Sequence, residues 1–462
     1  MPATALVPSR YLAFGQRTYR HTSGRPVRAV YHTATATALL LDTATVDALR
    51  GAAALDTVDP GSLGQLERLG LLVADGTDEA GAVIAAGRAA ADGRNRQFVI
   101  MPTAYCNMGC DYCGQQHERG TGIAPGRHRD ALSERVRQAA AGGRYDTITV
   151  RWFGGEPLMG YATIRALSAR FRADAHQHGV AYAAKLVTNG ALLDARKLRV
   201  LHQECAVGHI EITLDGDAAV HDASRPLNSG QGSYHRIVAA VRAALADPQL
   251  ARLRFTVRTN VGRHNADRAD MFAAAMADAG LADRRVVFYP APIHSWGNDV
   301  GGVALDRAEQ ARVELAWYAA YQRAGLASTP LPTVTRPVVC TAVSAHSEVV
   351  APDGRVYTCT EQPLVPGYTE QHVGTVTELP AGQTRPAGAY DDWYDALDAD
   401  ETGCRGCRLL PVCGGACPKL WREGKPPCPP LKANLTQRLD LYAAAAGLTP
   451  LPPQESTDPG PR

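Results

Sequence analysis

The chain has 462 residues, enough for two to four domains and a sizeable core. Its 48 Lys and Arg nearly balance its 46 Asp and Glu, for a formal net charge of +2, so charge gives no argument for binding nucleic acid or an anionic membrane. Residues 1–10 lack the apolar core and cleavage site of a signal peptide, and no run of about 18 apolar residues suggests a membrane helix, so we expect a cytoplasmic protein.

Residues 1–92 are expected to form a small winged-helix-like module. Its predicted elements are the strands Tyr11–Phe14 and Ala29–His32, the helices Thr45–Arg50 and Ser62–Leu69, and the apolar run Leu71–Val73. The following residues 92–95, with sequence Asp-Gly-Arg-Asn, are predicted to be a linker.

Apolar strands alternate with helices across residues 96–325. The predicted strands are Phe98–Met101, Ile148–Phe153, Lys185–Val187, His209–Leu214, Arg254–Val257 and Val286–Tyr289. The predicted helices are Asp130–Ala141, Thr163–His178, Ala191–His202, Tyr234–Ala246, Ala266–Ala279 and Asp306–Ala324. Six such units in series favour an α/β fold with a parallel sheet, because each crossover must return the chain to the same edge. We expect a partial (β/α)6 barrel of the TIM type, with its active site at the C-terminal ends of the strands.

Residues 336–446 are rich in cysteine and in loops, and they end in a predicted helix, Lys432–Ala446. The Pro-rich, polar residues 447–462 are expected to be disordered.

Eleven cysteines in a reducing compartment argue for metal rather than for disulfides. Three lie between residues 106 and 113 and seven between 340 and 428, whereas Cys205 stands alone. A disulfide framework would not leave residues 114–339 with a single cysteine. Cys205 itself is expected to be a buried thiol between a helix and a strand.

The first predicted barrel strand is followed by Cys106, Cys110 and Cys113 in the spacing C-x3-C-x2-C. Three thiolates on one loop can hold three irons of a 4Fe–4S cluster and leave the fourth iron open. An open iron can chelate the amino and carboxylate groups of S-adenosylmethionine (SAM), and an electron from the cluster then gives a 5′-deoxyadenosyl radical. The alternative is a zinc loop, but zinc usually takes four ligands in paired C-x2-C knuckles, and an aromatic residue, Tyr112, precedes the third cysteine here.

With this loop the chain resembles the radical SAM superfamily. The second strand ends in Gly154-Gly155-Glu156-Pro157, about forty residues beyond the cysteine loop, which resembles the SAM-amine motif of that family. The glycines allow a close approach of the backbone, and backbone carbonyls there can accept hydrogen bonds from the SAM ammonium.

The resemblance also implies SAM contacts at the next two strand ends. The residues concerned are Thr188 and Asn189 after the third strand, and Thr213 and Asp215 after the fourth. Arg225 lies where the resemblance puts an arginine on the SAM carboxylate, in a charge-assisted pair; taken alone it is a surface arginine.

Two further segments lie at the expected active rim, Arg258-Thr259-Asn260 and His294-Ser295-Trp296-Gly297-Asn298. They either touch the substrate or serve in capping and loop packing.

Seven cysteines follow the barrel in the pattern C-x13-G-x4-C, C-x2-C-x5-C-x3-C and a final cysteine, with Gly354 as the glycine: Cys340, Cys359, Cys404, Cys407, Cys413, Cys417 and Cys428. This resembles the SPASM domain, which implies two auxiliary 4Fe–4S clusters in addition to the SAM-binding one. The resemblance assigns Cys404, Cys407, Cys413 and Cys428 to one auxiliary cluster, and Cys340, Cys359 and Cys417 to the other.

The second of these sets is one ligand short. Either His346 supplies the missing ligand, or the fourth iron is open, or the histidine hydrogen bonds beside the site. A zinc knuckle at Cys404-x2-Cys407 is the competing interpretation.

Two extra clusters suggest that an electron leaves the substrate radical, for a net two-electron oxidation. Relatives with SPASM domains act mostly on ribosomally made peptides or on proteins. We therefore expect a peptide maturase that forms a carbon–carbon, thioether or ether crosslink in a precursor peptide. Its leader would bind residues 1–92 by strand addition, and flavodoxin or ferredoxin would donate the electron.

The alternatives are a sulfatase-maturing enzyme that makes formylglycine, a small-molecule dehydrogenase, and a zinc-stabilised binding protein. Sulfatase-maturing relatives have an aspartate directly after the second SPASM cysteine, whereas Thr360 and then Glu361 follow Cys359 here. Glu361 is the candidate catalytic base; otherwise it is a loop acid.

Overall fold

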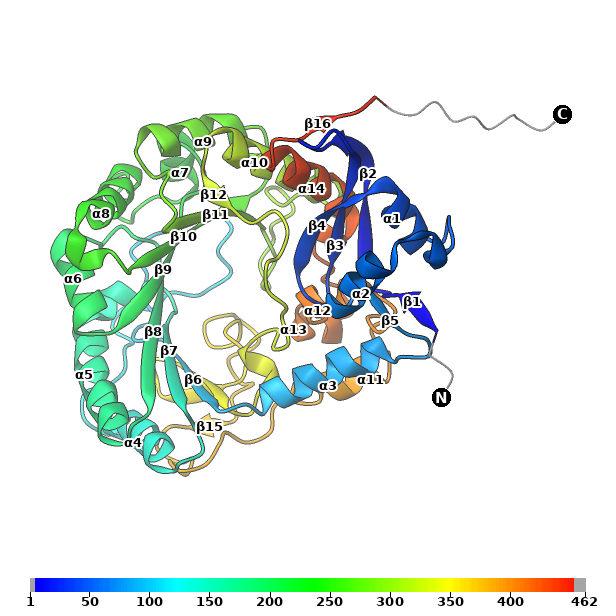
Figure 1. The fold of residues 1–462 in the computed structure, drawn as a ribbon. Coiled ribbons are helices and arrows are strands. Elements are labelled where there is room, and N and C mark those ends of the chain that lie inside the picture. The colour runs from blue at the N-terminus through cyan, green and yellow to red at the C-terminus, as the bar shows by residue number, and fades with distance from the viewer. Residues whose placement is uncertain (1–4, 453–462) are drawn as a thin grey trace.

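The computed structural model describes residues 5–452 (Figure 1). The N-terminal elements are β1 (Leu6–Pro8), β2 (Leu12–Arg20), β3 (Pro26–His32), β4 (Thr37–Asp42), α1 (Thr43–Leu49), the 3-10 turn Leu55–Thr57, α2 (Pro60–Arg68), β5 (Leu72–Ala74) and α3 (Glu79–Ala91). Asp42, Asp59 and Asp78 cap the three helices, each accepting a hydrogen bond from a backbone N–H of the first turn. The sequence analysis missed β4 and α3, because β4 is a short run without alternation and α3 is dominated by alanine and glycine.

The N-terminal strands form an antiparallel sheet in the order β16-β2-β3-β4. The strand β16 (Thr449–Pro450) comes from the C-terminal end and pairs with β2. The expectation of a disordered tail from residue 447 is therefore wrong for this segment, because its backbone pairs with a sheet edge; residues 453–462 lie outside the described range. The opposite edge strand of this sheet is β4.

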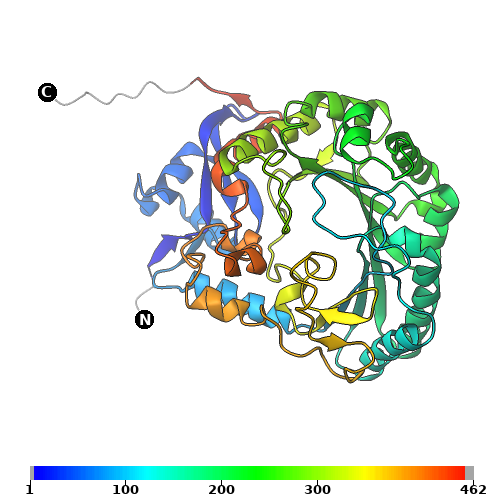
Figure 2. The ribbon, with the colours of Figure 1, turned by 180° about the vertical axis from the view of Figure 1, so that it is seen from behind.

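Six parallel strands follow in chain order and build the central sheet. They are β6 (Asn95–Ile100), β7 (Thr147–Trp152), β8 (Ala181–Thr188), β9 (Val207–Thr213), β10 (Arg254–Val261) and β11 (Val286–Pro292). The helices between and after them are α4 (Arg127–Ala141), α5 (Tyr161–Gln177), α6 (Ala195–Gln203), α7 (Ala218–Ser224), α8 (Tyr234–Ala246), α9 (Ala269–Asp278) and α10 (Arg307–Arg323), with 3-10 turns at Pro157–Gly160 and Pro248–Leu250. The predicted α/β fold with a partial barrel is confirmed; the sheet stays open, with helices around its convex side (Figures 1 and 2).

The C-terminal part of the chain extends this sheet. The short strand β12 (Ala327–Ser328) pairs with β11, and β13 (Ser347–Val350), β14 (Arg355–Tyr357) and β15 (Gly374–Thr375) continue beyond β6. The remaining elements are the 3-10 turn Thr341–Val343, α11 (Trp393–Asp398), α12 (Leu410–Cys413), α13 (Pro418–Arg422) and α14 (Leu431–Ala445). Helix α14 packs on β2 and shares a hydrophobic core with the N-terminal sheet, so the two ends of the chain fold against each other.

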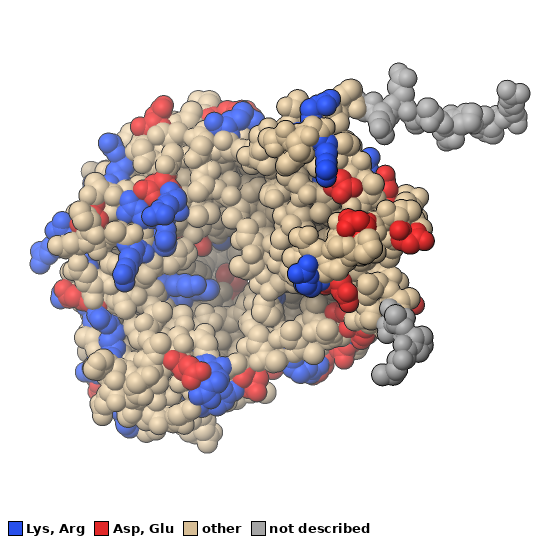
Figure 3. All heavy atoms as spheres, viewed as in Figure 1, with Lys and Arg blue, Asp and Glu red and all other residues tan. Residues whose placement is uncertain are grey.

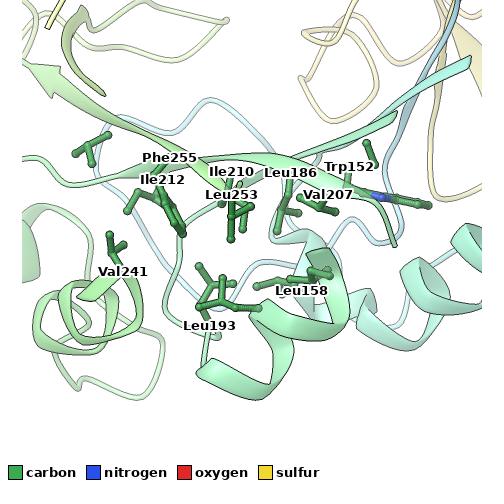
Figure 4. Close-up of a cluster of buried hydrophobic side chains, with 14 of the residues drawn as sticks. Trp152, Leu158, Leu186, Leu193, Val207, Ile210, Ile212, Val241, Leu253 and Phe255 are labelled. Atoms are coloured by element: carbon green, nitrogen blue, oxygen red, sulfur yellow. The ribbon is translucent and has the colours of Figure 1, made fainter. Parts of the chain in front are cut away.

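The main core lies between the parallel sheet and its helices. One face of each strand is apolar: Ile148, Val150 and Trp152 of β7 are fully buried, and Figure 4 shows further side chains of this layer. The residues between them, Thr149 and Arg151, point to the concave face because side chains alternate along a strand. The concave face is therefore polar. No helix among residues 5–452 is long and apolar enough to cross a membrane.

Candidate active site and cysteine clusters

A cavity of about 550 Å³ lies on the concave face of the sheet. Figure 3 shows a hollow near the middle of the molecule, with basic side chains at its rim and acidic ones inside. Residues from β7, β8, β9 and β10 line it on one side, and Thr360 and Glu361 line it from the C-terminal part. Cys113 and Tyr112 of the cysteine loop also border it, so the cavity adjoins the C-terminal ends of the strands, as a barrel enzyme requires.

The loop after β6 carries the first three cysteines into a largely buried position. Burial raises the pKa of the Cys106 thiol to about 12 and that of Cys110 to about 11. Burial also raises the pKa of Cys113, which borders the cavity. Thiols held in this way become thiolates only beside positive charge, and a metal centre supplies such charge.

The Gly154–Pro157 segment packs directly on this loop. A Cβ atom on Gly155 would lie 2.7 Å from the carbonyl oxygens of both Ala104 and Tyr105, and Gly154 has a φ of 117°. The Glu156 N–H donates to the Tyr105 carbonyl at 3.0 Å. The glycines therefore let the second strand end approach the cysteine loop itself, a role that the sequence analysis did not foresee.

Glu156 is completely buried and joins three strand ends. Its carboxylate accepts hydrogen bonds from the backbone N–H groups of Leu158 at 2.9 Å and Asn189 at 2.7 Å, and from the Thr188 hydroxyl at 2.7 Å. Asn189 in turn donates its side-chain amide to Asn107 at 2.8 Å, within the cysteine loop. Glu156, Thr188 and Asn189 thus position the loop and do not line the cavity.

A second network surrounds Tyr112. Its hydroxyl donates to Asp215 and accepts from the Arg225 guanidinium and from the Asn260 side-chain amide, the last at 2.8 Å. The other oxygen of the fully buried Asp215 accepts from the Asn260 N–H at 2.8 Å. Burial is the main reason that the pKa of Tyr112 lies well above its usual value, and it stays protonated. Asp215 thus fixes Tyr112, while Thr213, two residues earlier, borders the cavity.

Arg225 is a buried cation beside the cysteine loop and not a surface residue. One guanidinium nitrogen lies 3.8 Å from Asp215, and Nη2 lies 4.0 Å from the Met108 sulfur. Its Nε atom is buried and has no hydrogen-bond partner among the described residues. Burial opposes the charge of Arg225, but the negative charges of Cys110 in its thiolate form and of Asp215 raise its pKa well above the usual value. Three thiols with an under-satisfied cation beside them fit an anionic, thiolate-ligated cluster and a carboxylate ligand.

Four of the later cysteines gather around one small cavity of about 50 Å³. They are Cys404, Cys407, Cys413 and Cys428, together with Lys432, whose Nζ lies 3.7 Å from the Cys428 sulfur. This is the four-cysteine set that the resemblance assigned to one auxiliary cluster. Four cysteines around one cavity fit a 4Fe–4S cluster as a donor set.

Cys340, Cys359 and Cys417 lie near one another, and Cys359 follows β14 near the edge of the extended sheet. Burial raises the pKa of Cys359, and Glu361, Cys340 and Cys417 raise it further. His346 does not join them: its Nε2 lies 2.7 Å from Asp92, and its Nδ1 lies 2.9 Å from the Tyr145 hydroxyl. Both ring nitrogens are engaged between α3 and the barrel, which removes His346 as the missing ligand.

The two rim segments divide between the two roles expected of them. Arg258, Asn260, His294 and Trp296 line the cavity. Thr259 is buried and faces Tyr321, 3.4 Å from its hydroxyl. Asn298 does not line the cavity but donates to the Tyr112 carbonyl at 3.1 Å, which docks this loop on the cysteine loop; the other two residues, Ser295 and Gly297, also lie outside the cavity lining. Cys205 is fully buried, as predicted.

The sequence analysis missed the polar Gln115 and four ionisable residues of the cavity wall: Arg151, Lys185, His209 and Glu211. Arg151, Lys185 and Glu211 each lie between two buried residues of β7, β8 and β9, while His209 lies between the exposed Gly208 and the buried Ile210. Strands of a parallel sheet are normally apolar on both faces, so alternating charge within them was a signal for a hydrated interior.

Residues 100–247 match the family model described as the radical SAM superfamily. Among curated proteins, the chain is 28% identical over 153 residues to an uncharacterized protein of Synechocystis sp., covering 31% of this chain and 36% of that protein. The chain thus spans about a third of the length of this relative.

The fold resembles solved structures of anSMEcpe, an anaerobic sulfatase-maturating enzyme. One, with bound AdoMet and Kp18Cys peptide, superposes with a TM-score of 0.58 at 14% identity and covers 76% of this chain and 98% of that one. Another, histidine-tagged and with bound AdoMet, gives 0.57 at 14% identity, with 76% and 96% covered. At this identity the likeness concerns the fold. The part of the chain that matches the radical SAM family model, residues 100–247, contains the cysteine loop and the strand ends from β7 to β9 described above.

Proposed function

We propose that the chain is a peptide maturase that abstracts hydrogen from a ribosomally made precursor peptide and forms a carbon–carbon, thioether or ether crosslink. The match of residues 100–247 to the radical SAM family model supports SAM and a SAM-binding 4Fe–4S cluster, which would supply a 5′-deoxyadenosyl radical when loaded and reduced. The proposal adds two auxiliary clusters and an external one-electron donor such as flavodoxin or ferredoxin.

One observation carries the proposal: a single cavity is bordered both by Cys113 of the first cysteine loop and by Thr360 and Glu361, which follow Cys359 in the chain. A substrate in this cavity would lie between the SAM-binding cysteines and a second cysteine set. That arrangement suits a hydrogen abstraction followed by removal of an electron. A relative in fold was solved with AdoMet and a peptide, which supports a peptide as the occupant.

The chain's own residues would hold SAM at the strand ends. We assign this role to Tyr112, to the backbone of Gly154, Gly155, Glu156 and Pro157, to Thr188, Asn189, Thr213 and Asp215, and to Arg225. Glu156, Asp215 and Thr188 would act through the residues they fix, since their side-chain oxygens are engaged within the protein. The unpaired Nε of Arg225 favours a carboxylate partner.

Glu361 would accept the substrate proton. It lines the cavity, and burial is the main cause that raises its carboxyl pKa above the usual value, which makes it a better base; the Thr360 hydroxyl lies 3.2 Å away. Exchange for glutamine should abolish product formation and spare SAM cleavage, and unchanged product yield would remove Glu361 as the base.

The cluster assignment is tested by iron content. Replacing Cys106, Cys110 and Cys113, or either of the later cysteine sets, with alanine should each remove about four iron atoms per chain. Cys205→Ala is the matched control, because it removes a buried cysteine that belongs to none of the sets. Zinc in place of iron at Cys404, Cys407, Cys413 and Cys428, or at Cys340, Cys359 and Cys417, would contradict the assignment of auxiliary iron–sulfur clusters.

Leader binding is assigned to the free edge of the N-terminal sheet. The C-terminal strand β16 pairs with Tyr19 and Arg20 at the end of β2, whereas β4 has no strand beyond it among the described residues. A leader could add there as a further strand. A photo-crosslinking residue at the exposed Thr37 of β4 should capture the precursor, and one at Arg20 of β2, which is paired with Thr449 of β16, should not. Equal capture at both positions would contradict the edge assignment.

A second candidate function is that of a sulfatase-maturing enzyme, which the fold likeness over 98% of the anSMEcpe chain favours. Against it, no aspartate follows Cys359 directly. Incubation with a sulfatase peptide separates the two, since a formylglycine product would establish the second function.

The deciding experiment is anaerobic co-expression with the short open reading frames beside the gene, followed by peptide mass spectrometry. A loss of two hydrogens per modification with the parent enzyme and with Cys205→Ala, but not with Cys106→Ala, is the expected result. Unmodified peptides from a protein that still cleaves SAM would overturn a local precursor as substrate.

A further inference from the structure

Three basic side chains from three strands of the sheet line the cavity: Arg151 of β7, Lys185 of the adjacent β8, and Arg258 of β10, beyond β9. Figure 3 shows basic atoms at the edge of the central hollow. None of them belongs to the cysteine sets or to the residues assigned to SAM. We call them the cationic floor.

No carboxylate lies within salt-bridge distance of the cationic floor among the described residues, although the charges of Tyr289, Glu211 and Glu361 outweigh burial and raise the pKa of Arg258. Among residues 5–452, none of the three makes a salt bridge within 4.0 Å, and only Arg258 has a side-chain hydrogen bond, to the Asn260 oxygen at 2.8 Å. Arg151 and Lys185 stand directly opposite each other in the β7–β8 register, so their side chains lie on the same face. Like charges opposite each other destabilise a sheet, so an anion between them would relieve this repulsion.

The position of Lys185 opposite Arg151 makes its positive charge less favourable. Burial lowers the pKa of its ammonium group, and the charge of Arg151 lowers it further, with only partial compensation from Glu211. An exposed fraction above a third leaves its head group accessible from the cavity. A ligand carboxylate would restore the charge balance that the protein leaves incomplete.

The other charged groups of the cavity do not neutralise the floor. Glu211 and Glu361 supply two negative charges against three positive ones. Burial lowers the pKa of both His209 and His294, so both favour the neutral form, and His209 lies 2.7 Å from the Thr256 hydroxyl. The cavity wall thus keeps an excess of positive charge in a chain whose overall charge is nearly balanced.

We propose that Arg151, Lys185 and Arg258 bind a carboxylate of the peptide substrate, so that the maturase selects a segment with a carboxylate next to the residue that it modifies. The carboxylate belongs to an Asp or Glu side chain or to the C-terminus of the peptide. This inference rests on the proposed function and names the substrate class within it. Bidentate arginine contacts and the lysine charge would orient the segment before hydrogen abstraction.

The test measures the dissociation constants of three model peptides for the anaerobic, cluster-loaded protein with SAM. Ligand-observed NMR is the method. The peptides are N-acetyl-Ala-Glu-Ala-amide, its Gln isostere, and the Gln peptide with a free C-terminal carboxylate. The Glu peptide or the free-carboxylate peptide should bind about tenfold more tightly than the Gln amide, because charged hydrogen bonds contribute more than neutral ones. Whichever of the two binds more tightly identifies the source of the carboxylate.

Variants connect this preference to the cationic floor. Lys185→Met should reduce the preference to about twofold or less, because it removes one cation, and Lys185→Arg should restore it. Arg165→Met is the matched control, because Arg165 is an exposed arginine paired with Glu204 outside the cavity. The Arg165→Met variant should prefer the carboxylate peptide over the Gln amide by the same factor as the parent protein.

Equal binding of all three peptides, or no binding up to ~10 mM, overturns the inference. So does a preference that survives Lys185→Met and Arg151→Met. A shift in cluster potential with Arg151→Met and no change in peptide preference would show that Arg151 serves the nearby Cys340 instead, and would overturn its place in the floor. Because binding is measured apart from catalysis, a crosslinked precursor with equal peptide binding would reject this inference alone.

Discussion

Single side chains in this protein hold the strand ends in register with the cysteine loop. Glu156 is the central one, since its two oxygens accept two hydrogen bonds from the end of β8 and one from its own turn, and no cation within salt-bridge distance pairs with it among the described residues. Burial raises its pKa, while these hydrogen bonds oppose that shift and favour the ionised form. These hydrogen bonds give the Glu156 carboxylate a structural role in the fold, in addition to its place in the Gly154–Pro157 motif.

Glu156→Gln should destabilise the protein by about 1–3 kcal/mol, because an amide would turn an N–H group towards backbone donors and leave them unpaired. The free energy of unfolding from anaerobic urea titration checks this. Glu204→Gln is the control, since Glu204 is exposed and its pair with Arg165 is worth less than about 1 kcal/mol. Equal urea midpoints for the two variants would contradict the role of Glu156.

His221 makes stability depend on pH. It is completely buried, its Nδ1 accepts from the Asp215 N–H at 3.3 Å, and burial lowers its pKa from 6.5 to about 3. Below pH 6.5 the unfolded chain binds a proton that the folded chain does not, so the free energy of unfolding falls as the pH falls from 6.5 towards 3.

We expect this residue to account for about 2 kcal/mol of the loss in stability between pH 7 and pH 5. Urea unfolding at the two pH values should show a smaller loss for His221→Gln than for the parent. His235→Gln, on the exposed face of α8, should lose as much as the parent. If His221→Gln also loses as much, the assignment is wrong.

At the scale of elements, the end of β7 meets the cysteine loop without space for a side chain. The Gly155 backbone lies against two consecutive carbonyls of that loop, while Glu156 then hydrogen bonds back to it. The SAM-amine motif thus has a structural task in addition to the cofactor contact that the resemblance implies. It fixes the direction in which the three thiols point.

Gly155→Ala should cost about 1–3 kcal/mol, because the new methyl group overlaps backbone atoms that cannot turn away. It should also lower the iron retained by the SAM-binding cysteines. Gly208→Ala in β9 is the matched control, since a Cβ there meets nothing within 4 Å. The free energy of unfolding and the iron content of the protein measure the two effects. An unchanged iron content would contradict the role of Gly155 in positioning the cysteine loop.

At the scale of the whole molecule, a buried ion triad joins the barrel to the C-terminal part. Glu348 of β13 accepts hydrogen bonds from Arg96 of β6 and from Arg135 of α4, the latter at 3.0 Å from Nε. All three side chains are almost completely buried. The strand β13 lies in the chain between Cys340 and Cys359. The triad therefore fixes the position of the segment that joins these two cysteines.

Glu348→Gln would leave two buried arginines without a counter-charge, and we expect a loss of about 3–5 kcal/mol. Glu370→Gln serves as the control, because Glu370 is largely exposed and pairs with Arg355 at 3.2 Å. The difference in urea midpoint measures the effect. A midpoint for Glu348→Gln close to that of the control would show that the triad does not hold the two parts together.

The sequence by itself determined the parallel barrel and the grouping of the cysteines, because periodicity and spacing are local properties of the chain. Strand and helix positions agreed within a few residues for most barrel elements, and Cys205 was buried as its surroundings indicated. Only the tertiary structure decided which side chains face the cavity and which act behind it. Asp215 and Glu156 turn inward to hold other residues, Arg225 is buried beside the cysteine loop, and Arg151 and Lys185 meet on neighbouring strands. These outcomes depend on contacts between residues that are far apart in the chain, which local pattern and composition do not encode.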